Sequence, residues 1–479
     1  MNIRERLDFS CAVFDETGAL VANAPHLPVH LGAMGESVRT VLRLRGGTLK
    51  PGDAVALNNP FNGGTHLPDI TVVSPVFGPD GALRFLVANR GHHADIGGIT
   101  PGSTPPNSRT LEVEGVVIDN FLILDGGAFR EESFRALLGG ACYPARAPDV
   151  NVADIKAQIA ANAAGVGALL RVVAQYGWPT VRAYLGHVMD NAAESVRRVL
   201  DRVGDGSFVY RMDDGSKLCV AVRVDRANRR ARIDFSGTGA QRADNFNAPL
   251  SITRACVLYV LRCLVGTDIP LNDGCLQPIE ILVPPGTFLS PAPGAAVVAG
   301  NTEVSQAIAN ALFGAFATMA SAQATMNNFL FGDETYQYYE TICGGAGAGP
   351  GFDGASAVHT HMTNTRMTDP EVLELRYPVR LEAFSVRPNS GGAGRHRGGD
   401  GVVRRIRFLR RMTAIMVASR RAVAPFGLGG GGDGAPGRQW VERADGTRVP
   451  LGASDSATLE PGDMFVCETP GGGGHGTPL

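Results

Sequence analysis

The chain has 479 residues, of which 44% are hydrophobic and 19% charged, and its formal net charge is −2. Its length exceeds the roughly 250–300 residues that one hydrophobic core usually serves, so several sub-domains are expected. A net charge near zero, with no concentrated basic stretch, argues against a nucleic-acid partner. The only lysines are Lys50, Lys156 and Lys217, and none lies in the sequence that a phosphate-binding P-loop requires. We therefore expect no nucleotide site of that kind in this chain.

The cysteines and the apolar segments indicate the cellular compartment of the protein. Eight cysteines are spread along the chain without a Cys-x-x-Cys pair, which disfavours a zinc ribbon, an iron–sulfur cluster and a disulfide framework. The charged residues 1–8 lack the apolar core of a signal peptide. The longest apolar segment that we identify, 307–322, is shorter than the ~20 residues that span a bilayer. These features predict a cytoplasmic protein without a membrane segment.

The first 150 residues are predicted to be rich in β-strands. Residues 9–23 have the pattern of a β-hairpin with a glycine in its turn. A helical spacing over 30–44, a buried strand over 54–57 and a second hairpin over 70–89 follow. Because the chain begins almost inside a sheet, we expect a preceding segment to be missing or to be supplied by another chain.

The remainder of the chain contains three regions with different predicted secondary structure. Residues 151–203 show two helical stripes around a Gly-Trp-Pro turn, which predicts an αα-hairpin. Alternating strands follow, and then two apolar segments, 251–265 and 303–322, that are expected to be buried helices. From about residue 377, strands alternate with long glycine loops. The predicted fold is α+β, with a β-rich region, a helical hairpin, a mixed α/β region and a glycine-rich β sub-domain at 1–150, 151–204, 205–376 and 377–479.

Two short polar clusters end strand-like runs within residues 58–98. The first holds His66 and Asp69 in a His-x-x-Asp spacing, and the second holds His92, His93 and Asp95. Glycines flank both clusters and one hairpin joins them, so they are expected to lie close together. Imidazole and carboxylate groups suit Zn, Mn or Fe, and such a set leaves positions open for water or substrate. The alternative interpretation is that these groups only form hydrogen bonds within loops, and the spacing alone does not decide between the two.

Weaker signals appear later in the chain. His359 and His361 alternate in an extended segment and would share one face of it. Thr302 and Glu303 stand at the start of a buried helix, where Thr302 suits the N-cap position. The glycine runs at 344–347 and 471–476 fit either anion binding through backbone N–H groups or flexible loops.

Taken together, these motifs resemble the hydantoinase B/5-oxoprolinase family. The segments that carry the resemblance are 63–70, 90–98, 300–303, 339–341, 359–365 and 469–474. They occur in the family's order, and the match runs from Ile3 to the end of the chain. Relatives usually carry a helical segment before the motif that begins here at Ile3. This agrees with the expectation that a segment preceding the first hairpin is missing or supplied by another chain.

The resemblance implies a subunit, or the C-terminal half of a fused chain, that works with a hydantoinase A-type ATPase. In that scheme the partner uses ATP to phosphorylate a carbonyl or carboxyl oxygen. The B-type subunit then hydrolyses the activated amide of 5-oxoproline, a hydantoin or a related lactam. Two alternatives remain open: the subunit of an ATP-dependent ketone carboxylase, and a non-catalytic scaffold for the ATPase.

The resemblance also implies roles for particular residues. Its metal ligands correspond to Asp8, His66, Asp69 and His92. Further candidates for catalysis are His93, Asp95, Glu303, His359 and His361. Of these, the first two would orient a ligand imidazole, and the other three would transfer protons or contact the substrate.

Overall fold

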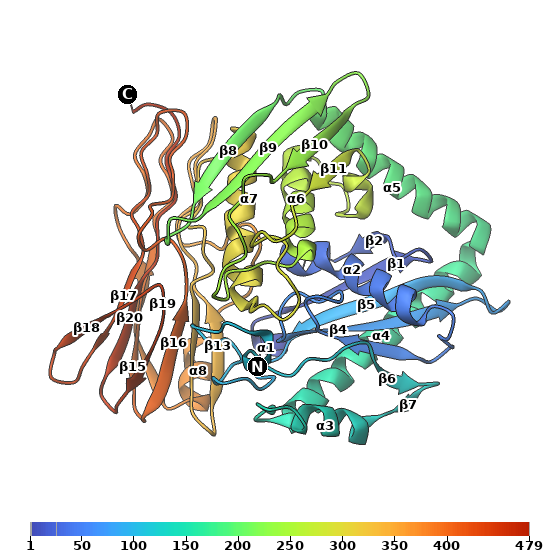
Figure 1. The fold of residues 1–479 in the computed structure, drawn as a ribbon, viewed down its shortest axis with the longest axis horizontal. Coiled ribbons are helices and arrows are strands. Elements are labelled where there is room, and N and C mark those ends of the chain that lie inside the picture. Colours follow the sequence, from blue (N-terminus) through green and yellow to red (C-terminus); the bar gives the residue numbers. More distant parts are fainter. Residues whose placement is uncertain (1, 25, 479) are drawn as a thin grey trace.

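The computed structural model describes residues 2–24 and 26–478 of the protein, and it places β-sheets on either side of two buried helices (Figure 1). These helices are α6 (Leu250–Val265) and α7 (Ser305–Ala315), which pack against each other. The N-terminal sheet lies on one side of them and the C-terminal sheets lie on the other (Figure 1). The α+β prediction is confirmed.

The N-terminal sheet has seven strands in the order β2-β1-β5-β4-β3-β6-β7. In that order they are Leu20–Asn23, Phe9–Asp15, Leu83–His92, Asp69–Phe77, Ala54–Leu57, Phe121–Asp125 and Ala128–Phe129. Both predicted hairpins are present, as the antiparallel pairs β1/β2 and β4/β5. Strands β4 and β5 are almost wholly buried because α2 (Pro28–Arg45) and α4 (Pro148–Tyr176) both pack on them.

The predicted helical hairpin is formed by α4 and α5 (Trp178–Leu200), with Gly177 between them at a φ of +78°. By length and composition alone, α4 is apolar enough to cross a membrane, so the longest apolar segment is not 307–322 as expected. Only 11% of the apolar window of α4 is buried, and Leu170, Val172 and Tyr176 are exposed on it. Shorter helices in this half are α1 (Asn2–Glu5), α3 (Glu131–Gly139) and the 3-10 turn η1 (Leu111–Val113).

A four-stranded sheet in the order β11-β10-β9-β8 covers the central region. Its strands are Ile279–Leu282, Arg230–Asp234, Lys217–Asp225 and Gly206–Arg211, and a 3-10 turn, η2 (Asp273–Leu276), precedes β11. The π-helical turn η3 (Gly300–Val304) leads into α7. The helix predicted to reach 322 ends at Ala315, because the chain turns at Ala317, where φ is +52°, and continues in extended form.

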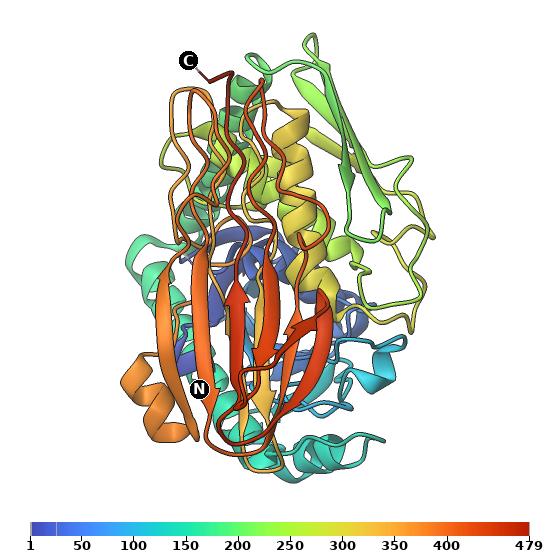
Figure 2. The same cartoon turned by 90° about the vertical axis from the view of Figure 1, so that its left-hand side faces the viewer.

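Two C-terminal sheets pack face to face (Figure 2). One has the order β13-β12-β16-β19, namely Gln337–Thr341, Asn328–Gly332, Met412–Val417 and Ser454–Leu459. The other has the order β14-β15-β20-β17-β18, namely Val379–Val386, Val402–Phe408, Met464–Glu468, Arg438–Glu442 and Arg448–Leu451. Helix α8 (Pro370–Arg376) precedes β14. The rings of Phe329 and Phe465 stack between the sheets at 4.0 Å, so strands on both sides of position 377 share one core.

The glycine runs form a close-packed layer of extended chain above these sheets (Figure 2). A Cβ atom on Gly472 would overlap the carbonyl oxygen of Ala346. The backbone N–H of Gly472 donates to the carbonyl of Gly399 at 2.9 Å, and that of Gly473 donates to Ser321 at 2.7 Å. These N–H groups are therefore satisfied by carbonyl oxygens, and the segments are packed against one another instead of forming open loops.

Substitution of Gly472 by alanine is expected to lower the free energy of unfolding by about 1–3 kcal/mol, because the added methyl must displace a neighbouring backbone. Gly186 is the matched control, since it is exposed on α5 and an added Cβ would meet no atom within 4 Å. Gly186→Ala is expected to stabilise the protein slightly through its helix propensity. Thermal unfolding of both variants measures the difference, and equal midpoints would contradict the packed layer.

Candidate metal centre

Three neighbouring strands bring the centre together at one end of the N-terminal sheet. Asp69 begins β4 and lies directly opposite His92, the last residue of β5. The backbone N–H of His92 donates to the carbonyl of Asp8, just before β1, at 3.0 Å. His66 comes from the loop that enters β4. The predicted convergence of the two polar clusters is therefore a consequence of antiparallel register.

His66, Asp69 and His92 form a compact group of metal-binding character. One possible ligand atom from each lies within 4.8 Å of the others, and all three side chains are buried. Nδ1 of His66 is 3.1 Å from one carboxylate oxygen of Asp69, and Nδ1 of His92 is 3.3 Å from the other. The structure thus unites three of the four ligands that the sequence predicts.

Asp8, the fourth predicted ligand, lies beside this group. Nε2 of His30 is 3.2 Å from the carboxylate of Asp69 and 3.9 Å from that of Asp8, so His30 stands between the two acids. Arg6 is also 3.9 Å from Asp8, and its guanidinium lies over the ring of Tyr339 at 4.5 Å. Because Arg6 donates to the carbonyl of Tyr339 at 2.9 Å, the start of the chain is tied to β13.

The electrostatics of the group suit a divalent cation. Burial would raise the pKa of Asp69, but His30 and His66 outweigh it and hold that pKa well below its usual value. Burial lowers the pKa of His66, with Asp69 offsetting this in part, which favours the neutral imidazole that binds metals. Nε2 of His92 is buried and has no hydrogen-bond partner among the described residues. An unpaired ring nitrogen beside an ionised carboxylate is a donor set that fits Zn, Mn or Fe.

The π-helical turn η3 adds a polar side chain to the group. Nδ2 of Asn301 donates to Asp69 at 3.4 Å, while its Oδ1 is buried without a partner in the described chain. Single π-turns occur often at functional sites, because the extra residue redirects the side chains around it. The sequence segment 300–303 therefore contributes Asn301 to the centre. Roles had been predicted only for Thr302 and Glu303 of this segment.

Glu303 lies on the same turn and is linked to the centre through two residues. It accepts a hydrogen bond from Nδ2 of Asn328 at 2.8 Å, and Oδ1 of Asn328 accepts one from the hydroxyl of Tyr339 at 2.9 Å. The ring of Tyr339 stacks on His92 at 4.7 Å. Burial, only partly offset by hydrogen bonds, raises the pKa of Glu303 to about 7. Its second oxygen is buried without a partner among the described residues.

The structure does not bring His93 and Asp95 into the group. The ring nitrogens of His93 lie 3.0 Å from Asn151 and 3.2 Å from Gln158, both on α4. Asp95 accepts hydrogen bonds from the backbone of Gly97 and from the side chain of Arg146 at 2.9 and 2.8 Å. These contacts anchor α4 and the loop after β5. They correspond to the alternative interpretation of the second cluster, in which its polar groups only form structural hydrogen bonds.

His359 and His361 both line a separate cavity of about 510 Å³. The segment is not extended as expected, because His361 lies in a turn with a φ of +57°. Nε2 of His359 is 3.4 Å from the hydroxyl of Thr341, and Nε2 of His361 is 3.3 Å from Oδ1 of Asn310. Burial lowers the pKa of His359 to about 4 and that of His361 to about 3. Both rings are therefore neutral near pH 7.

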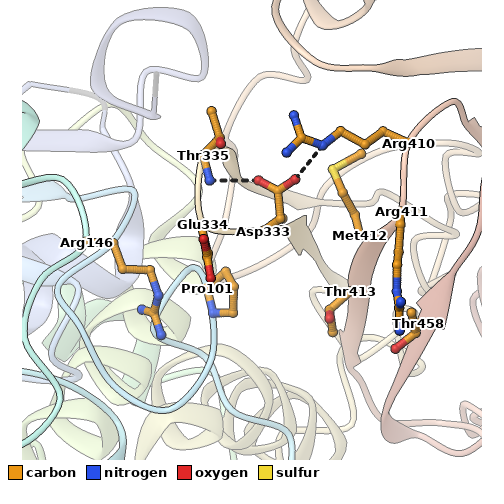
Figure 3. Close-up of a pocket in the computed structure, with 11 residues that line it drawn as sticks. Pro101, Arg146, Asp333, Glu334, Thr335, Arg410, Arg411, Met412, Thr413 and Thr458 are labelled. Atoms are coloured by element: carbon orange, nitrogen blue, oxygen red, sulfur yellow. Dashed lines mark hydrogen bonds and ion pairs between the residues drawn. The ribbon is translucent and has the colours of Figure 1, made fainter.

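A larger cavity, of about 820 Å³, lies elsewhere, and none of the predicted site residues lines it (Figure 3). Arg146, Arg410 and Arg411 line it. Each of these guanidiniums is paired with a carboxylate, of Asp95, Asp333 and Glu460 respectively. Its positive charge is thus neutralised locally, and size alone does not make this cavity the reaction site.

His30, Asn301 and Tyr339 contact the group but were not predicted from the sequence. His30 falls within the apolar spacing of a helix, where a lone histidine usually belongs to the core. Tyr339 stands 247 residues beyond His92 in the sequence, and only the approach of β13 to β5 brings the two rings together. The segments 300–303 and 339–341, which hold Asn301 and Tyr339, did appear among the family motifs, whereas no motif marked His30.

The chain is similar over its whole length to several proteins of known sequence. The chain is 46% identical to 5-oxoprolinase 1 of Arabidopsis thaliana, over 99% of this chain and 39% of that protein. It is 34% identical to an uncharacterized protein of Methanocaldococcus jannaschii, over 100% of this chain and 86% of that one. The chain thus spans about two fifths of the length of the curated 5-oxoprolinases it matches.

Solved structures show the same fold. An ATP-dependent caprolactamase from Pseudomonas jessenii superposes with a TM-score of 0.88 at 25% identity, over 98% of this chain and 85% of that one. An acetone carboxylase superposes with a TM-score of 0.86 at 17% identity, over 100% of this chain and 72% of that one. The family model for hydantoinase B/oxoprolinase matches residues 1–478. The chain therefore belongs to the hydantoinase B/oxoprolinase family.

Proposed function

We propose that this chain is the B-type part of an ATP-dependent cyclic amidohydrolase that acts on 5-oxoproline, a hydantoin or a related lactam. The observation that carries the proposal is the buried group of His66, Asp69 and His92 with an unpaired ring nitrogen. A 46% identical 5-oxoprolinase and the fold of an ATP-dependent caprolactamase support the choice of a cyclic amide.

In this proposal His66, Asp69 and His92 hold a divalent transition metal, with Asp8 as the fourth ligand. The ion would supply Lewis acidity and lower the pKa of water towards ~7, which an unstrained amide needs for attack near neutral pH. Tyr339 fixes the plane of the His92 ring by stacking on it, and Arg6 restrains Asp8. His30 lies between the two carboxylates, 3.2 Å from that of Asp69 and 3.9 Å from that of Asp8.

Glu303 is proposed to hold or release a proton during the reaction. With a pKa of about 7 it exists in both forms near neutrality, as a general acid or base requires. Hydrogen bonds through Asn328 and Tyr339 connect it with the stacked ring of His92. His93 and Asp95, which follow β5, would support the centre as structural residues through their contacts with α4 and with Arg146.

The ATP-using step is assigned to a hydantoinase A-type partner. The curated 5-oxoprolinases that the chain matches are about two and a half times longer than the matched region, since it covers 38–39% of them. We propose that the additional length of such relatives, or a separate subunit here, phosphorylates the amide oxygen. That reaction makes the ring carbon electrophilic before water attacks it.

Co-expression with an A-type subunit encoded nearby tests this function. ADP release is expected with at least one of 5-oxoproline, hydantoin and 2-pyrrolidinone, accompanied by the ring-opened product. His66→Ala is expected to lower product formation on the order of 100-fold or more, because it removes a proposed ligand. His187→Ala, an exposed histidine on α5, is the matched control and should leave the rate unchanged.

Three results would overturn this assignment. ADP release only with acetone and bicarbonate would identify a ketone carboxylase subunit. Absence of substrate-dependent ADP release across the whole panel would favour a scaffold for the ATPase. Full product formation by His66→Ala would show that the buried group is not the reactive centre.

The pKa of Glu303 also predicts a pH dependence of stability. The unfolded chain releases this proton near pH 4.5, whereas the folded chain keeps it until about pH 7, so stability is lost as pH rises between these values. Glu303→Gln removes that loss. The variant should gain about 3 kcal/mol over the wild type as the pH rises from 4.5 to 7, and the gain should level off above pH 7.

Thermal unfolding midpoints measured from pH 4.5 to 8 give this comparison. Glu132→Gln, at an exposed glutamate on α3, should show no such trend. A difference between Glu303→Gln and wild type that is independent of pH would mean that Glu303 ionises normally in the folded protein.

A further inference from the structure

The cavity beside His359 is bounded by the C-terminal turns of α6 and α7. Tyr259 and Cys263 line it from α6, Phe313 lines it from α7, and Met319 follows α7. Phe352 closes another side from the glycine-rich layer. Its volume of about 510 Å³ and its aromatic walls suit a small ring compound.

The electrostatics of this cavity disfavour an anion. None of the described residues that line it is Asp, Glu, Lys or Arg. The two histidines are neutral near pH 7, because burial lowers their pKa values to about 4 and 3. The C-terminal ends of α6 and α7 both approach it, and such ends carry partial negative charge. A carboxylate placed here would meet two unfavourable dipoles and no charged side chain in the cavity wall, whereas an N–H donor is favoured. The cation that acts on His359 is Arg6, which lies behind the wall and donates to Thr341.

Polar atoms for orienting a ligand are nevertheless present. The hydroxyls of Thr318 and Thr360 and Nδ1 of His359 are buried without a hydrogen-bond partner among the described residues. Leaving such atoms unpaired is unfavourable, so a ligand that pairs with them is favoured. Hydroxyls and a neutral imidazole can donate or accept, so they match a molecule that has one N–H and one C=O group.

The cavity is connected with the metal centre through β13. Thr341 contacts His359 at 3.4 Å, and Tyr339 stacks on His92. Residues two apart in a strand point to the same face, so one face of β13 contacts His359 and His92 in succession. Arg6 donates to Thr341 at 3.3 Å and also lies beside Asp8. A ring held at His359 would therefore be linked to the metal centre through the side chains of Thr341, Tyr339 and Arg6.

We propose that this cavity binds the substrate ring before its phosphorylation, and that its ligands are small uncharged cyclic amides. This inference rests on the proposed function and narrows it, because it selects uncharged lactams and hydantoins over 5-oxoproline, whose carboxylate is ionised at neutral pH. The amide N–H and C=O are held by Thr318, Thr360 and His359, and the ring lies against Tyr259, Phe313 and Met319.

Cys263 supplies a direct test, because it is exposed and lines the cavity, while the other exposed cysteine, Cys142, lies elsewhere. The purified chain is treated with N-ethylmaleimide at about pH 8.5, and modification of each cysteine is followed by mass spectrometry. Saturating 2-pyrrolidinone is expected to slow modification of Cys263 at least fivefold and to leave Cys142 unchanged. 5-Oxoproline, the same ring with a carboxylate, should need at least tenfold higher concentrations.

Two variants at the cavity wall strengthen the test. Thr360→Val should raise the half-protecting concentration of 2-pyrrolidinone at least threefold, and Met319→Trp should abolish protection by filling the space. Thr413→Val, in the 820 Å³ cavity, is the matched control and should behave as wild type. Circular dichroism confirms that each variant is folded.

Equal or stronger protection by 5-oxoproline would overturn the preference for uncharged rings. Absence of protection, together with absence of saturable binding of 2-pyrrolidinone by ligand-observed NMR, would overturn the binding site itself. Neither measurement uses the partner or ATP. If the reconstituted complex hydrolyses a cyclic amide while Cys263 is not protected, this inference fails and the proposed function stands.

Discussion

The carboxylate of Asp69 is the point on which the centre depends. It lies within 3.4 Å of His30, His66, His92 and Asn301, which come from a helix, a loop, a strand and a π-turn. A buried carboxylate is costly unless its oxygens are paired, and each of these contacts reduces that cost. The same side chain thus gathers the candidate ligands and couples distant segments of the chain.

Two buried arginines, Arg90 and Arg6, support the acids of the centre. Arg90 donates to Thr65 and Ser37, and Thr65 in turn contacts Asp69 at 3.2 Å. Arg6 performs a similar task for Asp8 and is itself held by the carbonyl of Tyr339. Because both guanidiniums are fully buried and bonded to neutral groups as well, they restrain the acids without a tight ion pair. The geometry leaves the carboxylates available to a cation.

Much of the N-terminal fold could be predicted because its signals are local. Alternation and turn residues located both hairpins, and the register of β4 and β5 brought His66, Asp69 and His92 together. The rest could not be predicted because it depends on long-range contacts. The stacking of Tyr339 on His92 and the contact of Asn301 with Asp69 join segments more than 200 residues apart. The glycine layer likewise forms only when the glycine-rich runs at 344–347, 391–401, 427–437 and 471–476 meet, so each run alone looked like a loop.

Anomalous X-ray diffraction from crystals of the chain, loaded with Zn or Mn and measured at the absorption edge, tests whether these residues form a metal centre. One ion per chain is expected, about 2.0–2.3 Å from Nε2 of His92 and from ligand atoms of His66 and Asp69. His92→Ala should lose the peak, whereas His93→Ala should retain it, because the ring of His93 contacts α4. The absence of a peak at these residues in fully loaded wild-type protein would contradict the assignment of a metal centre.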